Sequence, residues 1–252
     1  MTTPIATDWT GQIERSCSYD YENNAVINKT QTVTRWRNVQ NAIISPEQSL
    51  NFELIPPEDI EFYLGGHLWR GVDRGFGGVS KFIATGTDYS EEFNRNDIYR
   101  QEQVFRLFRF DTDAENNFKY FGEPVPPLGV QTDTGWIGSI STSMNVKQSW
   151  AQNTAVEVQA EIILTRRKDV KYLSTTEGNC GDIWGPEQLQ FYMCHENYTM
   201  PTYGIKLVGF DVADPYLCIS ESIAPLGSDP YTAQIVQRWI YLSAFQTMDL
   251  TA

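Results

Sequence analysis

The sequence predicts a mainly β protein, an antiparallel β-sandwich or a set of barrel-like sheets with long hairpins and a few short helices. Its clearest stretch runs from Thr154 to Arg166, where apolar and polar residues alternate. Successive side chains of a strand point to opposite faces, so this alternation predicts a half-buried strand. The residues expected on its inward face are Val156, Val158, Ala160, Ile162 and Leu164.

Two further observations support this fold class. A second alternating run precedes the first and would pair with it as a hairpin. The chain also contains 13 Phe, 13 Tyr and 7 Trp, and aromatic residues favour strands and extensive contact surfaces. The residues of the second run that would share the inward face are Trp136, Ile140, Thr142, Met144 and Val146.

The length of 252 residues suits one large β domain or two smaller ones. We expect a single β-rich domain over 1–252 with an N-terminal hairpin arm at 1–40. The stiff, proline-rich connector at 123–129 marks a possible internal boundary.

The N-terminal hairpin is predicted from an alternating strand at 12–21 and a Thr- and Val-rich return strand at 26–37. Its faces mix polar and aromatic residues, so neither side is expected to form a deep core. Such a hairpin is marginal alone and would need a partner sheet, which a neighbouring subunit could provide.

Short helices are predicted where Pro follows a capping position, at Ser45–Gln48 and at Pro56–Asp59. The second helix would place Ile60, Tyr63 and Leu64 on one side and end at the Gly65–Gly66 pair. A cap at Ser90 would open another short helix.

A glycine-rich loop is expected at 65–78, with six glycines in fourteen residues. It also carries the densest polar cluster, which makes it the candidate binding or interface site. Its arginines would engage an anion and its tryptophan would offer a stacking face. A structural loop pinned by an ion pair is the alternative. The candidate residues are His67, Trp69, Arg70, Asp73 and Arg74.

Strands are next expected at 79–87 and 103–110, the latter in a hairpin with 117–121. The acidic turn at 111–116 resembles a calcium loop. However, it lacks the glycine at the sixth position, and Gly122 stands where the bidentate Glu belongs. We therefore expect an exposed hairpin tip there and no metal.

Strands are also expected at 204–211 and 215–222. The C-terminal segment from Asp229 fits both a helix and a buried strand, and we favour a strand preceded by one helical turn. The basic cluster at 166–169 is expected to be a solvated strand end.

The cysteines form no CxxC pair and are too few for a disulfide scaffold, so free thiols made in a reducing cytosol are expected. Adjacent Cys194 and His195 would point to opposite faces of a strand, which argues against a metal site. The cysteines are Cys17, Cys180, Cys194 and Cys218.

The formal net charge of −13 repels phosphate backbones and anionic lipid headgroups, so we expect no stable nucleic-acid binding. No apolar run is long enough to span a membrane, and the first residues lack the features of a signal peptide. No nucleophile elbow, zinc-protease or phosphate-loop motif occurs. The sequence therefore predicts no enzyme, no catalytic residue and no cofactor, with a carboxylate-based hydrolase as a minor alternative.

These features together favour a structural subunit of a multi-copy assembly. A virion component of the bacteriophage tail, neck or baseplate type, assembled in the host cytoplasm, is the expected kind. Its partners would be copies of itself and other assembly subunits, bound through sheet edges and aromatic anchors. The alternative is a carbohydrate-binding β-sandwich that stacks tryptophans on a glycan.

Overall fold

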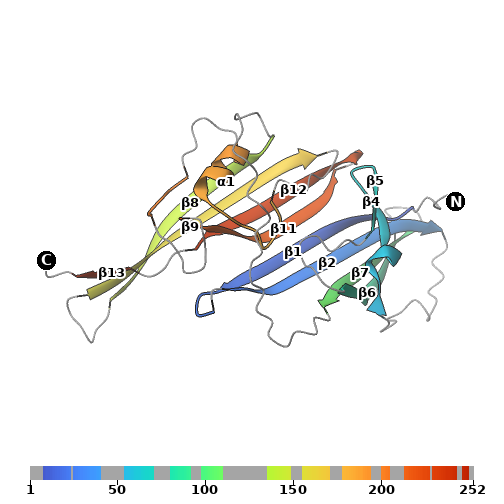
Figure 1. Cartoon of the computed structure of the whole chain (residues 1–252). Helices are drawn as coiled ribbons and strands as arrows, with labels where there is room; N and C mark the ends of the chain where they lie inside the picture. Colours follow the sequence, from blue (N-terminus) through green and yellow to red (C-terminus); the bar gives the residue numbers. More distant parts are fainter. Residues whose placement is uncertain are drawn as a thin grey trace.

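The structure is a computed structural model. It describes residues 8–23, 25–40, 54–70, 80–91, 98–109, 135–148, 155–170, 178–193, 200–204, 213–227, 229–242 and 246–249. The described strands form one open, 13-stranded sheet that is antiparallel apart from a single β1–β4 bridge. This confirms the predicted mainly β, sandwich-like class (Figure 1).

The main path of the sheet runs β13-β9-β12-β11-β1-β2-β7-β6-β3. Strand β8 pairs with β9, short β10 pairs with β11, and β4 and β5 form a hairpin beside β1. The strands are β1 (Thr10–Asp20), β2 (Ala25–Gln40), β3 (Leu54–Ile55), β4 (Glu61–Leu64), β5 (His67–Arg70), β6 (Ser80–Glu91), β7 (Ile98–Arg109), β8 (Ile137–Gln148), β9 (Ala155–Val170), β10 (Ile183–Trp184), β11 (Tyr216–Leu226), β12 (Asp229–Tyr241) and β13 (Gln246–Asp249).

The predicted N-terminal hairpin forms as β1 and β2, but in the middle of the sheet. It is flanked by β11 and β7 of the same chain. Ile13 and Val33 are fully buried opposite each other, so the expectation that neither face forms a deep core is wrong. The inward face also carries Arg15 and Gln31, and these polar residues hide the core pattern in the sequence.

Apolar residues on one face of the long central strands build two cores. Along β12 the inward positions are every second residue. Ala233 and Ile235 belong to the first core, and Trp239 and Tyr241 belong to the second. Gln237 lies between them and is also buried. A polar zone therefore separates two apolar cores on one face of the sheet.

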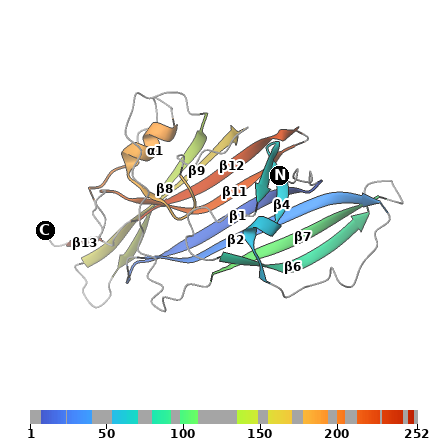
Figure 2. The same cartoon turned by 45° about the vertical axis from the view of Figure 1, so that its right-hand side comes forward.

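Different elements cover the two cores (Figure 2). Phe62 and Leu64 of β4 pack into the first core. Leu189 of the helix α1 (Pro186–Met193) and Trp184 of β10 pack into the second. Helix α1 is not predicted from the sequence, because its segment is rich in turn-forming residues. Among the described residues, no helix is long and apolar enough to cross a membrane.

The predicted helix at 56–64 is wrong. Only a 3-10 turn forms at Pro57–Asp59, and β4 follows it. Ile60, Phe62 and Leu64 are the buried residues, a spacing of two that belongs to a strand. Gly65 and Gly66 have φ values of 58° and 74° and form the tight turn to β5, as a two-residue hairpin turn requires.

Two further helix predictions are corrected. Ser90 continues strand β6 and caps no helix, and the segment from Asp229 begins β12 with no helical turn. Strand β7 pairs with β6 and β2. The predicted elements at 45–48, 111–121, 123–129 and 205–211 lie outside the described residues.

Candidate functional site

The predicted site at 67–74 is only partly described. His67, Trp69 and Arg70 lie in β5, so a hairpin strand replaces the first part of the expected loop. Trp69 is half-buried and packs against the first core, and His67 is exposed. Asp73 and Arg74 lie outside the described residues. The described residues therefore do not test whether the five candidates form one site, and the site stays a prediction.

A row of polar side chains crosses the sheet between the two cores, and its residues are paired neighbours on adjacent strands. We call it the polar belt: Arg166, Gln237, Glu221, Arg15 and Gln31, from β9 through β12, β11 and β1 to β2. All of these residues are buried.

Hydrogen bonds run through the whole polar belt. Arg166 donates from Nε and Nη2 to Gln237 Oε1, at 3.0 and 2.8 Å. Gln237 donates from Nε2 to Glu221 Oε2 at 2.6 Å. Arg15 forms an ion pair with Glu221 through Nη1, and its Nε donates to Gln31 Oε1 at 2.9 Å. Each partner is lost if one strand shifts by a residue, so the polar belt fixes the register of the central strands.

Arg166 also lies among three tryptophans. Its guanidinium carbon is 4.1 Å from the ring centre of Trp136, 5.4 Å from that of Trp184 and 5.1 Å from that of Trp239. The predicted solvated cluster at 166–169 is thus wrong for Arg166, whose exposure is 0%. The sequence did contain a signal for the burial of Arg166, because its position on the strand continues the inward series of Ile162 and Leu164.

The exposed candidate surface is the outer edge of β8. Strand β8 pairs with β9 along its whole length, from Ile137↔Arg167 to Gln148↔Val156, without a bulge. No other described strand pairs with it. The backbone N–H and C=O groups of such an edge can accept another strand.

Apolar residues of β8 are exposed. Ile140 packs against the second core, but Met144 and Val146 on the same face are 63% and 58% exposed. Ile137 is 55% exposed. The predicted inward face of this run is therefore correct for Trp136 and Ile140 and wrong beyond them. Strands β8 and β9 extend past the elements that cover the core (Figure 1).

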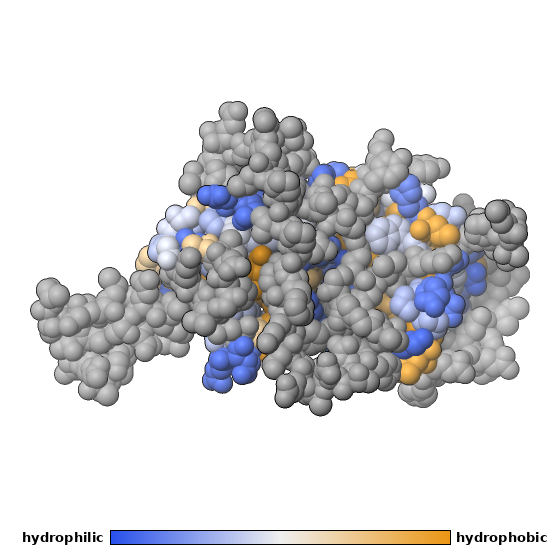
Figure 3. Space-filling view, viewed as in Figure 1, coloured by the Kyte–Doolittle hydropathy of each residue, from blue (hydrophilic) through white to orange (hydrophobic). Residues whose placement is uncertain are grey.

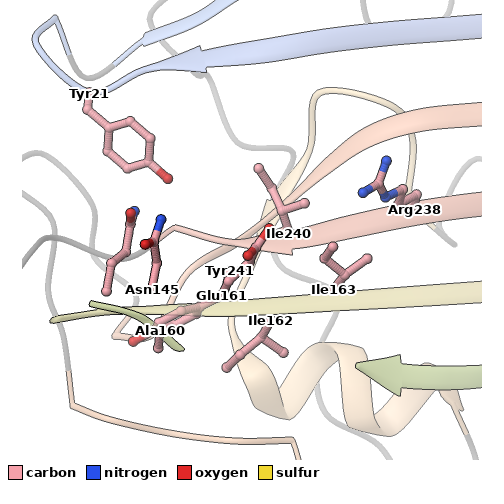
Figure 4. A pocket seen from close by; sticks show the side chains of 10 residues that line it. Tyr21, Asn145, Ala160, Glu161, Ile162, Ile163, Arg238, Ile240 and Tyr241 are labelled. Atoms are coloured by element: carbon pink, nitrogen blue, oxygen red, sulfur yellow. The ribbon is translucent and has the colours of Figure 1, made fainter. Parts of the chain in front are cut away.

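A small hollow lies beside this part of β8. Its volume is about 220 Å³, and its lining includes Tyr21, Asn145, Glu161 and Arg238. Figure 4 shows Tyr21 at the tip of the β1–β2 hairpin, pointing toward Asn145 and Glu161. Binding sites for drug-sized molecules usually measure about 300–1,000 Å³, so this hollow suits a side chain or a few water molecules.

Part of the opposite face of the central strands is rich in hydroxyl groups, while a small apolar cluster that includes Leu217 and Leu242 is buried elsewhere on it. A shallow depression of about 290 Å³ in the hydroxyl-rich part is lined by Ser16, Thr30, Thr32, Ser220 and Ser222, together with Glu14 and Arg238. Among the coloured residues of Figure 3, hydrophilic and hydrophobic areas lie side by side.

The described cysteines, Cys17, Cys180 and Cys218, are free thiols, and Cys194 lies outside the described residues. Cys17 is half-buried and its Sγ lies 3.7 Å from that of Cys180. In the part of the chain that the structure describes, no group of three or more His, Cys, Asp or Glu residues is arranged to hold a metal ion.

Comparison with known proteins gives no relative. No family model matches the chain, and no curated protein or solved structure matches it either.

Proposed function

We propose that the chain is a structural subunit of a multi-copy assembly, and that copies join along the outer edge of β8. The observation that carries the proposal is the length of this edge, along which no strand of the described part of the chain pairs except β9. Strand addition supplies main-chain hydrogen bonds for affinity, and exposed side chains on either face supply specificity.

The β8 edge has few of the devices that usually prevent such pairing. Natural edge strands are protected by charges, prolines, bulges or short length. Strand β8 has 12 residues, IGSISTSMNVKQ, with no proline and no acidic residue, and Lys147 is its only charge. Its register with β9 is continuous.

A second copy of this chain is the occupant that we propose. The formal net charge of −13 makes two copies repel each other in general. The absence of acids from β8 removes that repulsion where the copies would meet. The apolar stripe of Met144 and Val146 continues the second core outward, so pairing would bury surface that water now contacts.

A virion of the bacteriophage tail, neck or baseplate type is the assembly that we propose. This part rests on the β-rich, acidic and aromatic character of the sequence. The N-terminal hairpin does not support this proposal, because its strands pair with other strands of the same chain.

The carbohydrate-binding alternative has less support. A glycan needs exposed aromatic rings, and Trp9, Trp136, Trp184 and Trp239 are buried. Trp69 packs on the first core, and the half-buried Trp36 has the Arg100 guanidinium carbon 4.7 Å from its ring centre. Trp150 lies outside the described residues.

The test is the mass of the protein in solution, measured by light scattering over a range of concentrations. We expect the wild type to exceed the single-chain mass of 28.8 kDa. Replacing Met144 and Val146 together by Lys should return it to one chain, because inward-pointing charges block strand addition.

The matched control replaces exposed Asn38 of β2 and Ser90 of β6 by Lys, which adds the same charge on strands that several other strands of the sheet separate from β8. This variant should assemble like the wild type. A wild type that stays a single chain at high concentration would refute the proposal. So would an assembly that the Met144→Lys, Val146→Lys variant leaves intact.

A further inference from the structure

Two thiols from distant parts of the chain are in contact. Cys17 belongs to β1, and Cys180 lies in the turn before β10, 163 residues along the chain. Their sulfur atoms are 3.7 Å apart, and the Cys180 thiol donates to the Cys17 sulfur. This contact plays no part in the proposed assembly.

The sheet brings these thiols together through a change of partner along β11. Strand β1 follows β11 from Ile13↔Ile223 to Ser16↔Ser220 and pairs no further with it. The register of β1 with β2 also shifts between Ser16 and Ser18, where Cys17 lies opposite two residues of β2, Asn28 and Lys29, so the extra residue of this bulge is on β2. A bulge redirects a side chain and bends its strand.

Beyond the last β1–β11 pair, the segment around Cys180 pairs with β11 in place of β1. The Gly181 N–H donates to Cys218 O at 2.8 Å, and the Cys218 N–H donates to Asp182 O at 2.9 Å. Pairing then continues with Ile183↔Leu217. Since Cys17 also donates from Sγ to Cys218 O at 3.3 Å, one carbonyl group holds both sides of the thiol contact.

The two thiols are chemically unequal. The hydrogen bond from Cys180 lowers the pKa of Cys17, and the nearby Lys29 ammonium lowers it further, while burial and Asp182 oppose them. The same hydrogen bond and burial raise the pKa of Cys180. Cys17 is half-buried and Cys180 is buried. Cys17 is therefore the thiol expected to react first.

We propose that Cys17 and Cys180 are a redox-active pair that closes to a reversible disulfide when the protein meets a peroxide. Their sulfur atoms must approach from contact to a bond length of about 2.05 Å. Cys180 lies in a turn and outside the strands, so the movement can occur there without breaking the ladder of β1.

The reaction has two steps and needs only the peroxide. The Cys17 thiolate attacks one oxygen of hydrogen peroxide; the S–O bond forms, the O–O bond breaks, and the released hydroxide takes a proton to become water. The Cys180 sulfur then loses its proton and attacks the Cys17 sulfur. The S–S bond forms, and the S–O bond breaks as a second water leaves. Overall, two thiols are oxidised to a disulfide and one peroxide is reduced to two waters.

The test treats the folded full-length protein with hydrogen peroxide, then unfolds it in an alkylating reagent and measures its mass and linked peptides. We expect a loss of two hydrogens, two alkylated cysteines in place of four, and a Cys17–Cys180 cross-link that dithiothreitol reverses. The cross-link should also raise the melting temperature by at least about 5 °C, because it closes a very long loop of the unfolded chain.

Variants separate this pair from the other thiols. Cys218→Ser is the matched control and should still form the cross-link, because Cys218 donates to Ser220 O and contributes only its backbone carbonyl to the pair. Cys17→Ser and Cys180→Ser should each abolish the link. Peptide mapping of the wild type alone decides the question if a variant fails to fold. Four free thiols, a link through Cys194 or Cys218, or sulfinic acid without a link would each overturn the proposal.

Discussion

Arg166 and Trp136 form a buried stacked pair, with the guanidinium carbon 4.1 Å from the centre of the indole ring. The arginine is 0% exposed and the tryptophan 2% exposed. This pair anchors the end of the polar belt, where β9 meets the segment that leads into β8. A buried arginine is costly to desolvate and is retained only with good partners.

Replacing Arg166 by Ala should lower the free energy of unfolding by about 3–5 kcal/mol, since it removes a desolvated cation–π contact, two hydrogen bonds and buried volume. The matched control is Arg167→Ala. Arg167 is the next residue on β9 and is exposed, so its loss should change stability by no more than about 0.5 kcal/mol. Urea unfolding measures both. Equal losses would show that Arg166 has no special role.

The ion pair of Arg15 and Glu221 gives a second prediction. Arg15→Ala should lower the free energy of unfolding by about 3–5 kcal/mol, because it leaves the buried Glu221 carboxylate without its cation. The double variant Arg15→Met, Glu221→Leu replaces both charges by apolar groups and should recover more than half of that loss. If the double variant is the less stable of the two, the penalty does not come from an uncompensated charge.

Two glycines in strands give opposite predictions. A Cβ atom on Gly11 would lie 2.5 Å from Phe62 Cδ2 and 2.9 Å from the Thr34 carbonyl oxygen, whereas one on Gly86 would meet nothing within 4 Å. Gly11→Ala should therefore lower the free energy of unfolding by about 3 kcal/mol, because the added methyl group overpacks this site. Gly86→Ala should leave the free energy of unfolding unchanged or raise it by up to about 1 kcal/mol, because alanine reduces the conformational entropy of the unfolded chain. Equal effects in thermal unfolding would contradict the close packing of β4 on β1.

The turn between β1 and β2 gives a prediction on pH. The side-chain amide of Asn23 donates to Asp20 at 2.6 Å, and this bond, with the N–H groups of Glu22 and Asn23, lowers the pKa of the carboxyl group. Its stabilising effect is complete above the unfolded pKa of about 3.9 and is lost as pH falls through the lower folded value. The wild type should melt higher than Asp20→Asn at pH 7. That difference should disappear at pH 2; a difference constant with pH would contradict it.

The sequence was sufficient for the fold class because the long strands keep strict alternation. Strand β9 follows the pattern of Ile162 and Leu164, and the ambiguous C-terminal segment forms β12 with the same spacing. The alternation of apolar and polar residues did not predict which side chains are buried where polar residues face inward. Arg15, Gln31 and Arg166 look solvated in the sequence, but each finds its partner on a neighbouring strand, and that pairing depends on sheet order.

The candidate surface could not be read from the sequence for a related reason. Met144 and Val146 have the alternation of a buried face, and the sequence alone does not show where the covering elements end. Among the described elements, α1 and β10 contribute residues that cover the second core, while Met144 and Val146 stay exposed. The contact of Cys17 and Cys180 likewise depends on a bulge and on a partner change along β11.

Amide hydrogen exchange along β8 tests the central claim most directly. At low concentration, the amides of 139–148 that point away from β9 should exchange quickly, because no described strand protects them. At concentrations where copies join, the same amides should slow by at least about tenfold, while those of β12, paired on both sides, stay unchanged. Assembly that leaves exchange along β8 unaltered would contradict the claim.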